Sequence, residues 1–192
     1  TYQQSNSAIT ILDVEGHIKQ SWSIPVTDAH GITMVEEGNI EYLWIADNGA
    51  KRLANLNYEY PSGNRTGQVL KVTMSGELVM RIEKPDVEVY QKEEYSPTWI
   101  AVNEKRHGGN GDIWVADGYG ASYVHRYDQE GSYLSSINGG EGKAGVFNCP
   151  HAIFIDRRTS PAELYVADRA NGRVQVYDLD GNYLRVFGNE FL

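Results

Sequence analysis

Apolar and polar residues alternate over short runs along the chain, and these runs recur as two phrases. The first is an apolar pair followed by Ala-Asp and a small or polar turn, and it occurs as L-W-I-A-D-N-G from Leu43, I-W-V-A-D-G-Y-G from Ile113 and L-Y-V-A-D-R-A-N-G-R from Leu164. The second precedes each copy, as A-H-G-I-T-M from Ala29, P-T-W-I-A-V from Pro97 and P-H-A-I-F-I from Pro150. Such self-similarity is typical of a protein built from repeated structural units.

Each unit ends in a predicted β-hairpin. Two runs of period-2 alternation flank a glycine-containing turn in the segments that begin at Val69, Val124 and Val174, and glycine supplies the positive φ that such turns need. A fourth copy begins at Ile9, with no inner pair of strands before it. Units of four antiparallel strands are typical of the blades of a β-propeller, which arranges about four to eight blades around an axis.

The sequence therefore predicts an all-β protein with a single, partial β-propeller domain over residues 1–192. Complete blades are expected at approximately 26–82, 95–137 and 148–188, and half a blade at 1–25. About three and a half blades are too few to close a ring of the usual size. We expect the chain to be part of a longer protein; the other explanation is a homodimer that closes the open propeller, because open blades leave exposed strand edges.

Charge and cysteine content limit the partners. The formal net charge of −9 argues against a nucleic-acid partner and against an acidic membrane surface. No apolar run reaches the roughly 18 residues of a membrane span. The single cysteine, Cys149, excludes an internal disulfide, so nothing in the chain requires an oxidising compartment.

Candidate chemistry lies at the start of the first strand of each blade. His30, Thr98 and His151 occupy the equivalent position in the three blades, and the first strands of a propeller line its central channel. The two imidazoles are therefore expected to meet at one mouth, where neutral imidazole is a common zinc ligand. The alternative is that each histidine is a polar channel residue that is hydrogen-bonded to backbone.

The Ala-Asp turns form a second set. Asp47, Asp117 and Asp168 recur in every blade, and we expect them to be structural acceptors of backbone N–H groups. The residues that follow differ between blades. Tyr119 is a candidate proton-transfer group, or else a turn aromatic packed on the next blade, and Arg169 is a candidate carboxylate ligand, or else a bridge between blades.

Other polar features carry weaker signals. His17, His107 and His125 are expected to face solvent, His125 because it alternates along an outer strand. Two long polar segments, 47–67 and 85–97, interrupt the compact repeat, and such loops are either functional or simply solvated.

These residues together resemble a known family. The run W-V-A-D-G-Y-G-A-S-Y-V-H-R-Y-D-Q-E-G, then F-N-C-P-H-A-I-F-I and L-Y-V-A-D-R-A-N-G-R-V-Q-V-Y-D, looks like the NHL-repeat propellers. It is similar in particular to the catalytic core of the peptidyl-alpha-hydroxyglycine alpha-amidating lyases, and A-H-G-I from Ala29 matches an earlier motif of that family. The resemblance covers approximately residues 29–188.

The resemblance implies a six-bladed ring, a channel zinc held by three histidines and a structural calcium. It maps two zinc ligands onto His30 and His151, a catalytic tyrosine onto Tyr119, a substrate-contacting arginine onto Arg169, and a backbone carbonyl ligand of calcium onto Ile32. The implied reaction is zinc-assisted cleavage of a carbinolamide C–N bond in a small-molecule or peptide substrate, which releases a peptide amide and glyoxylate.

The chain also departs from this family. The family's third zinc histidine and its calcium-binding aspartate belong to a blade beyond Leu192, and another essential arginine belongs before Thr1. The absence of disulfides indicates a bacterial-type relative. The sequence predicts a soluble protein and leaves its compartment open, with secretion or the periplasm as one option for the full-length parent. The alternative function is a non-catalytic NHL-repeat scaffold that binds protein or glycan partners through its top face and the 48–66 loop.

Overall fold

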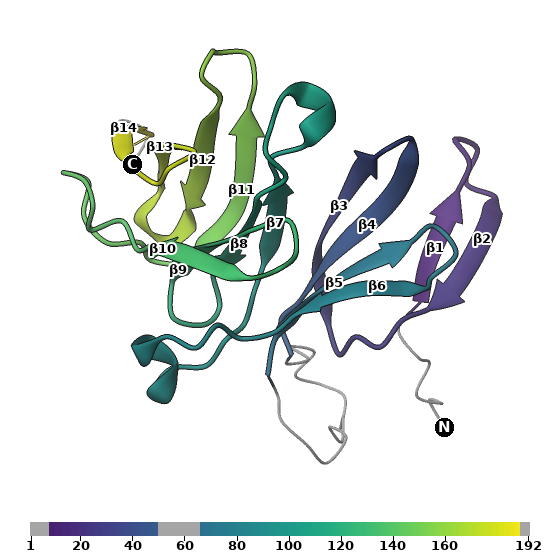
Figure 1. The fold of residues 1–192 in the computed structure, drawn as a ribbon. Coiled ribbons are helices and arrows are strands. Elements are labelled where there is room, and N and C mark those ends of the chain that lie inside the picture. The colour runs from purple at the N-terminus through teal and green to yellow at the C-terminus, as the bar shows by residue number, and fades with distance from the viewer. Residues whose placement is uncertain (1–7, 50–65, 189–192) are drawn as a thin grey trace.

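A computed structural model describes residues 8–49 and 66–188 of the chain (Figure 1). Within these residues all regular structure is β-sheet except for three short 3-10 helices, which confirms the predicted all-β fold. A two-stranded sheet, here called the half-blade, is followed by three four-stranded sheets, the first, second and third blades. The sheets succeed one another around an arc, from the half-blade at the right of Figure 1 to the third blade at the left.

The strands follow the chain in simple order. The half-blade contains β1 (Ala8–Leu12) and β2 (Ile18–Ser23), and the first blade contains β3 (Ala29–Glu37), β4 (Ile40–Asp47), β5 (Gln68–Thr73) and β6 (Leu78–Ile82). The second blade contains β7 (Trp99–Val102), β8 (Ile113–Asp117), β9 (Tyr123–Tyr127) and β10 (Tyr133–Ile137). The third contains β11 (Pro150–Asp156), β12 (Glu163–Asp168), β13 (Arg173–Asp178) and β14 (Tyr183–Phe187).

Every blade is an antiparallel meander in which each strand pairs with its sequence neighbour. The Ala-Asp phrase forms the second strand of each blade, between the first and third strands. In the third blade, Val166 of β12 pairs with Ile153 of β11 on one side and with Gln175 of β13 on the other. The hairpins turn at glycines, and Gly131 and Gly181 have φ of 85° and 90°. This left-handed region is open to glycine at little cost, so the turn chemistry predicted for these positions is present.

The hydrophobic core lies between neighbouring sheets. One cluster joins the first and second blades, with Trp44 and Val69 packed near Ile100 and Tyr127. A second cluster joins the second and third blades, and a third joins the half-blade to the first. Because the second blade packs on both sides, its inner strands bury residues of both parities, and every residue of β8 is buried, whereas outer strands such as β10 stay partly exposed.

The first strands of the three blades lie next to one another, with β7 in contact with both β3 and β11. The approach of β3 to β7 depends on Gly31, since a Cβ there would lie 2.4 Å from the backbone oxygen of Thr98. Equivalent residues of neighbouring first strands are therefore brought to the same end of the arc.

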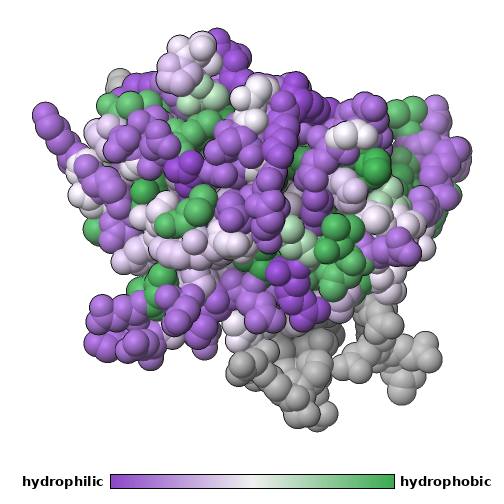
Figure 2. Space-filling model, viewed as in Figure 1, coloured by the Kyte–Doolittle hydropathy of each residue, from purple (hydrophilic) through white to green (hydrophobic). Residues whose placement is uncertain are grey.

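The first and third blades expose apolar side chains. On the third blade Phe154 is 63% exposed and Phe187 44%, and on β3 of the first blade Met34 is 55% exposed. Figure 2 shows apolar patches between polar ones on the face in view. In the described part of the chain no helix is long and apolar enough to cross a membrane.

The segment between the first and second blades differs from a solvated loop. It contains the 3-10 helix η1 (Glu88–Gln91), and it buries Tyr90 and Tyr95 in the core between these blades. The prediction of a solvated excursion over 85–97 is therefore wrong for its two tyrosines, because their rings fill the inter-blade space. Most of the other long segment, residues 50–65, lies outside the described residues, so the 48–66 loop stays a prediction.

Candidate functional site

The equivalent positions of the first and third blades bring two histidines together. His30 and His151 each follow the first residue of their strands, and their ring centroids are 4.8 Å apart at an interplanar angle of 79°. Both side chains are half-buried. They meet although they lie on different blades, because the intervening blade carries the smaller Thr98 at the same position.

Tyr119 joins these two imidazoles. It follows β8 in the Gly-Tyr-Gly turn, and its hydroxyl oxygen lies 3.2 Å from Nε2 of His30 and 2.9 Å from Nε2 of His151. Its ring makes edge contacts with both imidazoles at centroid distances of 5.0 and 5.3 Å. We call His30, Tyr119 and His151 the His-Tyr cluster.

The direction of the hydrogen bonds follows from one backbone contact. Nδ1 of His30 lies 3.0 Å from the carbonyl oxygen of Thr98, which only accepts, so Nδ1 carries the proton. In neutral His30 the Nε2 atom is then an acceptor, and the Tyr119 hydroxyl donates to it. The same hydroxyl oxygen accepts from the Nε2–H of His151, since a phenol has a single proton.

Arg169 completes the cluster from the third blade. It begins η3 (Arg169–Asn171), directly after β12, and its backbone N–H donates to the carbonyl of Cys149 at 3.1 Å. Its Nη1 donates to the Tyr119 hydroxyl at 3.4 Å, and its guanidinium carbon lies 5.4 Å from the ring centroid of Tyr119. The hydrogen bond to Tyr119 raises the pKa of the Arg169 guanidinium. Arg169 remains exposed, with its charge available to a ligand.

The repeated aspartates have the structural role expected of them. All three are buried and accept backbone N–H groups from the segment just before the first strand of their own blade. Asp47 accepts from Thr27 and Asp28, Asp117 from Ser96, and Asp168 from Asn148, at 2.6 to 2.9 Å. Each carboxylate thus fixes the end of a blade at which the His-Tyr cluster lies.

His125 does not face solvent, contrary to the prediction from its alternation along an outer strand. Its side chain is fully buried, and burial lowers the pKa of the imidazole to about 3. It hydrogen-bonds the hydroxyls of Tyr90 and Ser136. The prediction is wrong because the segment before β7 covers this strand. His17 and His107 are exposed, as predicted.

The His-Tyr cluster meets part of the requirement for zinc. His30 presents Nε2 with Nδ1 held by a carbonyl, which is the usual arrangement of a metal-ligating histidine. Together, His30 and His151 offer two imidazole ligands. A zinc site needs three or more His, Cys, Asp or Glu side chains whose ligand atoms lie close together. Among the described residues, one such group has its ligand atoms within 4.8 Å of one another, and it consists of Asp13, Glu15 and His17.

That acidic group lies at the exposed turn of the half-blade, so the described residues supply no third ligand of these types beside the His-Tyr cluster. Ile32 lies two residues beyond His30 in β3, with its side chain 48% exposed. Carboxylate oxygens are the usual partners of calcium, and the described residues place no such metal-binding group of carboxylates near Ile32.

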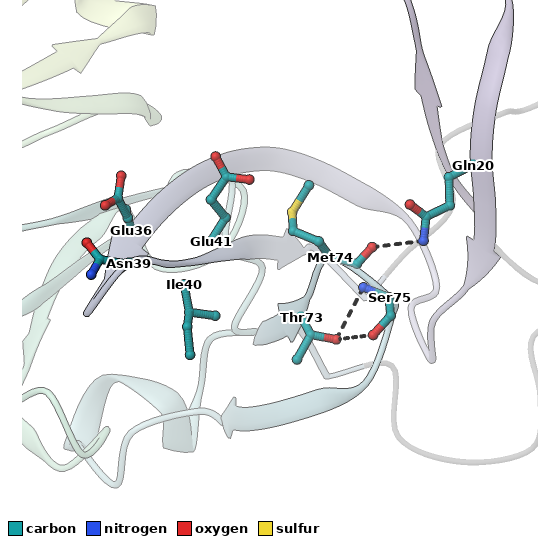
Figure 3. A pocket seen from close by; sticks show the side chains of 8 residues that line it. All are labelled: Gln20, Glu36, Asn39, Ile40, Glu41, Thr73, Met74 and Ser75. Carbon is teal, nitrogen blue, oxygen red and sulfur yellow. Dashed lines mark hydrogen bonds between the residues drawn. The ribbon is translucent and has the colours of Figure 1, made fainter.

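A polar hollow lies at the opposite ends of the same strands (Figure 3). Its lining includes Glu36 and Glu41, which flank the turn between β3 and β4, whereas His30 lies at the start of β3. Across the hollow, Gln20 Nε2 donates to the carbonyl of Met74 at 3.2 Å and joins the half-blade to the first blade. This hollow is therefore separate from the His-Tyr cluster.

Sheet topology and the positions of the first strands define the class of protein: the chain is part of a β-propeller, with a cluster of histidine, tyrosine and arginine side chains at one end of its first strands. Its sequence is similar to NHL-repeat proteins. It is 26% identical over 186 residues to NHL repeat-containing protein 3 of Homo sapiens, a match that covers 95% of this chain and 49% of that protein.

A second relative is a probable peptidyl-alpha-hydroxyglycine alpha-amidating lyase of Caenorhabditis elegans, which is 28% identical over 151 residues, or 77% of this chain and 36% of the relative. The chain thus spans about half or less of the length of these two curated relatives. The sequence matches no protein-family model.

Solved structures support the propeller fold. A protein of unknown function from Bacteroides caccae aligns with a TM-score of 0.59 at 13% identity, over 96% of this chain and 55% of its own. A catalytically inactive virginiamycin B lyase from Staphylococcus aureus with quinupristin aligns with a TM-score of 0.58 at 15% identity, over 95% and 48%. At these identities the likeness concerns the fold alone.

Proposed function

We propose that the chain forms part of a lyase of the peptidyl-alpha-hydroxyglycine alpha-amidating type, which cleaves the C–N bond of a carbinolamide and releases glyoxylate. The observation that carries the proposal is the convergence of His30, His151, Tyr119 and Arg169, four residues that come from three blades. The similarity to an amidating lyase adds support from an independent source.

His30 and His151 would hold the zinc through ring nitrogens, with a further ligand from outside the described residues. When bound there, zinc supplies a Lewis acid that lowers the pKa of a substrate hydroxyl. The carbonyl of Thr98 keeps the proton of His30 on Nδ1, so Nε2 stays available as a ligand. Calcium at the carbonyl of Ile32 belongs to the proposal only through the resemblance, and no step below depends on it.

Tyr119 is proposed as the base. In its ionised form it would take the proton of the substrate hydroxyl; the C–O bond then becomes a C=O bond as the C–N bond breaks. The amide nitrogen leaves with the electron pair of the C–N bond and receives the proton that Tyr119 took, which returns Tyr119 to its ionised form. Arg169 contacts the same oxygen, because its Nη1 donates to it at 3.4 Å. Its exposed guanidinium can also hold the carboxylate of the glyoxylate half in a bidentate pair.

Metal content tests this proposal first. The purified chain is titrated with zinc, beside the double variant His30→Ala with His151→Ala. The bound metal is measured at equilibrium, because a site with two imidazoles would release it on dialysis. We expect stoichiometric zinc that the double variant loses. The matched control is His17→Ala with His107→Ala, which removes two exposed histidines and should leave the zinc unchanged. Absence of zinc from the folded wild type, or zinc retained by the double variant, contradicts the proposal.

Glyoxylate release from a peptidyl-alpha-hydroxyglycine tests the roles of the side chains. Tyr119→Phe keeps the ring and removes the proposed base, so kcat should fall by about 10²- to 10⁴-fold. Arg169→Lys keeps the charge and removes the planar fork, so the main effect should be on KM. Equal kcat for wild type and Tyr119→Phe would remove Tyr119 from the reaction.

A second candidate function is a non-catalytic NHL-repeat scaffold that binds protein or glycan partners. The similarity to NHL repeat-containing protein 3, which extends over 95% of this chain, favours it. The two candidates differ in the zinc experiment: a scaffold has no need of a metal that depends on His30 and His151.

A further inference from the structure

A buried hydrogen-bond network lies behind the turn that carries Tyr119, and its centre is the carboxylate of Asp117. This carboxylate is fully buried. It accepts the backbone N–H of Ser96 at 2.6 Å, the backbone N–H of Ala121 at 2.7 Å and the hydroxyl of Tyr90 at 2.6 Å. Two of these three donors are backbone groups next to Tyr119: Ala121 lies two residues after it, and Ser96 accepts its N–H. The position of the carboxylate therefore determines that of the turn.

The turn closes tightly around this carboxylate. A Cβ on Gly120 would lie 2.4 Å from Oδ1 of Asp117, so this glycine lets the backbone pass directly over the carboxylate. The backbone N–H of Tyr119 donates to the carbonyl of Ser96 at 3.2 Å. Ser96 is also the residue whose own backbone N–H donates to the Asp117 carboxylate. Tyr119 is thereby held between two segments that both depend on Asp117.

The buried aspartate of the second blade, Asp117, is stabilised differently from the equivalent aspartate of the third blade, Asp168. In the third blade, Asp168 forms an ion pair with Nε of Arg173 at 2.7 Å. Asp117 has no ion-pair partner within the described residues, and burial raises the pKa of its carboxyl. A buried carboxylate without a cation depends on hydrogen-bond donors, and the hydroxyl of Tyr90 is the side-chain donor that reaches it.

The hydroxyl of Tyr90 is itself oriented from behind. It lies 2.5 Å from Nε2 of His125, whose Nδ1 lies 2.7 Å from the hydroxyl of Ser136. Because the Tyr90 proton is used on Asp117, Nε2 of His125 must donate and its Nδ1 must accept from Ser136. The Ser136 oxygen in turn lies 2.8 Å from the hydroxyl of Tyr133 at the protein surface.

We propose that Tyr90 and His125 are positioning residues for Tyr119, which act through Asp117. All donors in the series point the same way, from Tyr133 at the surface to the carboxylate of Asp117, so every member has one defined orientation. Removal of the Tyr90 hydroxyl leaves Asp117 short of a donor, and the turn then relaxes away from His30 and His151. The functional importance of this role rests on the proposed function; the contacts themselves do not.

Histidine NMR tests the proposal without a substrate or a metal. The chain has five histidines, so their Cε1–H signals can be resolved and assigned by substitution. Tyr119→Phe should shift the signals of His30 and His151, since it removes the hydroxyl between them. Tyr90→Phe should shift the same two signals, although Tyr90 touches neither ring. The signals of His17 and His107 serve as internal references.

The matched control is Tyr165→Phe, which removes a tyrosine hydroxyl that contacts Glu163 and Arg185 in the third blade. It should leave the signals of His30 and His151 in place. The proposal is overturned when Tyr90→Phe moves the His125 signal and lowers stability but leaves those of His30 and His151 at wild-type positions, because the network is then only structural.

Should Tyr90→Phe fail to fold, His125→Gln replaces it. Gln175 occupies the equivalent position in the third blade, so glutamine suits this strand, and its amide still reaches toward Tyr90 with altered geometry. The same two signals are expected to shift, by less than in Tyr119→Phe; unchanged signals reject the proposal. A negative zinc experiment would reject the lyase proposal and leave this NMR result standing, so the two failures are distinguishable.

Discussion

His30 on the first blade directs Nδ1 at the backbone carbonyl of Thr98 on the second, 3.0 Å away. At the position where the first and third blades carry histidines, the second blade thus contributes a backbone carbonyl to the His-Tyr cluster. This contact requires β3 and β7 to lie unusually close. The orientation of His30 therefore depends on how the two blades pack as well as on the His30 side chain.

Gly31→Ala should separate these blades and destabilise the protein. The added Cβ would lie 2.4 Å from the Thr98 backbone oxygen and 3.1 Å from Cα of Trp99, and neither can move alone. Overpacking of this kind costs about 1–3 kcal/mol, which exceeds the roughly 0.4–1 kcal/mol that Gly→Ala contributes through the unfolded chain. Urea unfolding measures the change.

Gly140→Ala is the matched control for this substitution. Its Cβ would lie 3.0 Å from Oδ1 of Asn138, the tip of a side chain that has to shift by only a few tenths of an ångström, and Gly140 does not have a positive φ. We expect a change in the free energy of unfolding within about 0.5 kcal/mol. An equal loss in both variants would show that the approach of β3 to β7 carries no special constraint.

Two ion pairs of the same length should differ widely in their effect on stability. Arg173 and Asp168 pair at 2.7 Å with both side chains largely buried, whereas Arg106 and Glu36 pair at 2.7 Å with side chains that are 40% and 37% exposed. Arg173→Ala leaves a buried carboxylate without its cation, and we expect a loss of about 3–5 kcal/mol. Glu36→Ala should cost less than about 1 kcal/mol, because Arg106 is exposed and keeps its pair with Glu104.

Thermal and urea unfolding of the two variants compares these losses directly. Arg173 also donates to the carbonyls of Gly145 and Val146, so part of its effect is the loss of these bonds. The double variant Arg173→Ala with Asp168→Asn removes the uncompensated charge and should recover part of the stability. No recovery would mean that the contacts to the loop, and not the ion pair, account for the loss.

The buried imidazole of His125 predicts a specific loss of stability in mild acid. Burial lowers the pKa of His125 in the folded protein to about 3, against an ordinary value of 6.5. The contribution of neutral His125 to the free energy of unfolding is therefore fully present above pH 6.5. It is lost as the pH falls toward 3, because in this range the unfolded chain takes up a proton that the folded protein does not. The expected slope is about 1.4 kcal/mol per pH unit below about pH 6.

Urea unfolding between about pH 7 and 4.5 measures this slope. His125→Gln should lower the slope by about 1.4 kcal/mol per pH unit, which corresponds to the uptake of one proton. Tyr90 and Ser136 face the imidazole through hydrogen bonds, and four further tyrosines face it through their rings: Tyr95, Tyr123, Tyr127 and Tyr133. Above about pH 4.5 these hydroxyls do not titrate, so they do not mimic the effect. Equal slopes in wild type and variant would mean that His125 accepts a proton in the folded protein.

The order of strands could be predicted from the sequence because the same phrases recur. The Ala-Asp phrase ends the second strand of all three blades, and glycine marks hairpin turns such as those at Gly131 and Gly181. Repetition also placed His30 and His151 at one end of the arc, since equivalent positions of first strands point to one region. Both inferences require only that the blades are alike.

The rest depends on what is not repeated. Tyr90 lies in an acidic segment without periodicity, and nothing local indicates that its hydroxyl reaches Asp117 in the second blade. The burial of His125 follows from that segment's path, so it could not be inferred from β9 alone. The tyrosines at 90 and 95, in an otherwise acidic loop, were the available signal, because aromatic residues in a polar segment commonly anchor it to a core.

The open face of the third blade leads to a last prediction, on self-association. In the second blade the equivalent face is buried, with Ala101 and Trp114 packed against the third blade. In the third blade the corresponding residues are Phe154, which is 63% exposed, and Tyr165. The surface that fits this face is therefore another sheet of the same repeat, and we propose that a second copy of the chain supplies it when the isolated chain is concentrated.

Light scattering after size exclusion should then show a molar mass that rises with concentration toward twice the 21.5 kDa of the chain. Phe154→Asp places a charge at the centre of this face and should keep the protein at the mass of one copy. Val14→Asp is the control, because Val14 is 98% exposed on the half-blade turn, away from the third blade. A constant mass for the wild type, or an equal effect of both substitutions, would show that copies do not associate through the third blade.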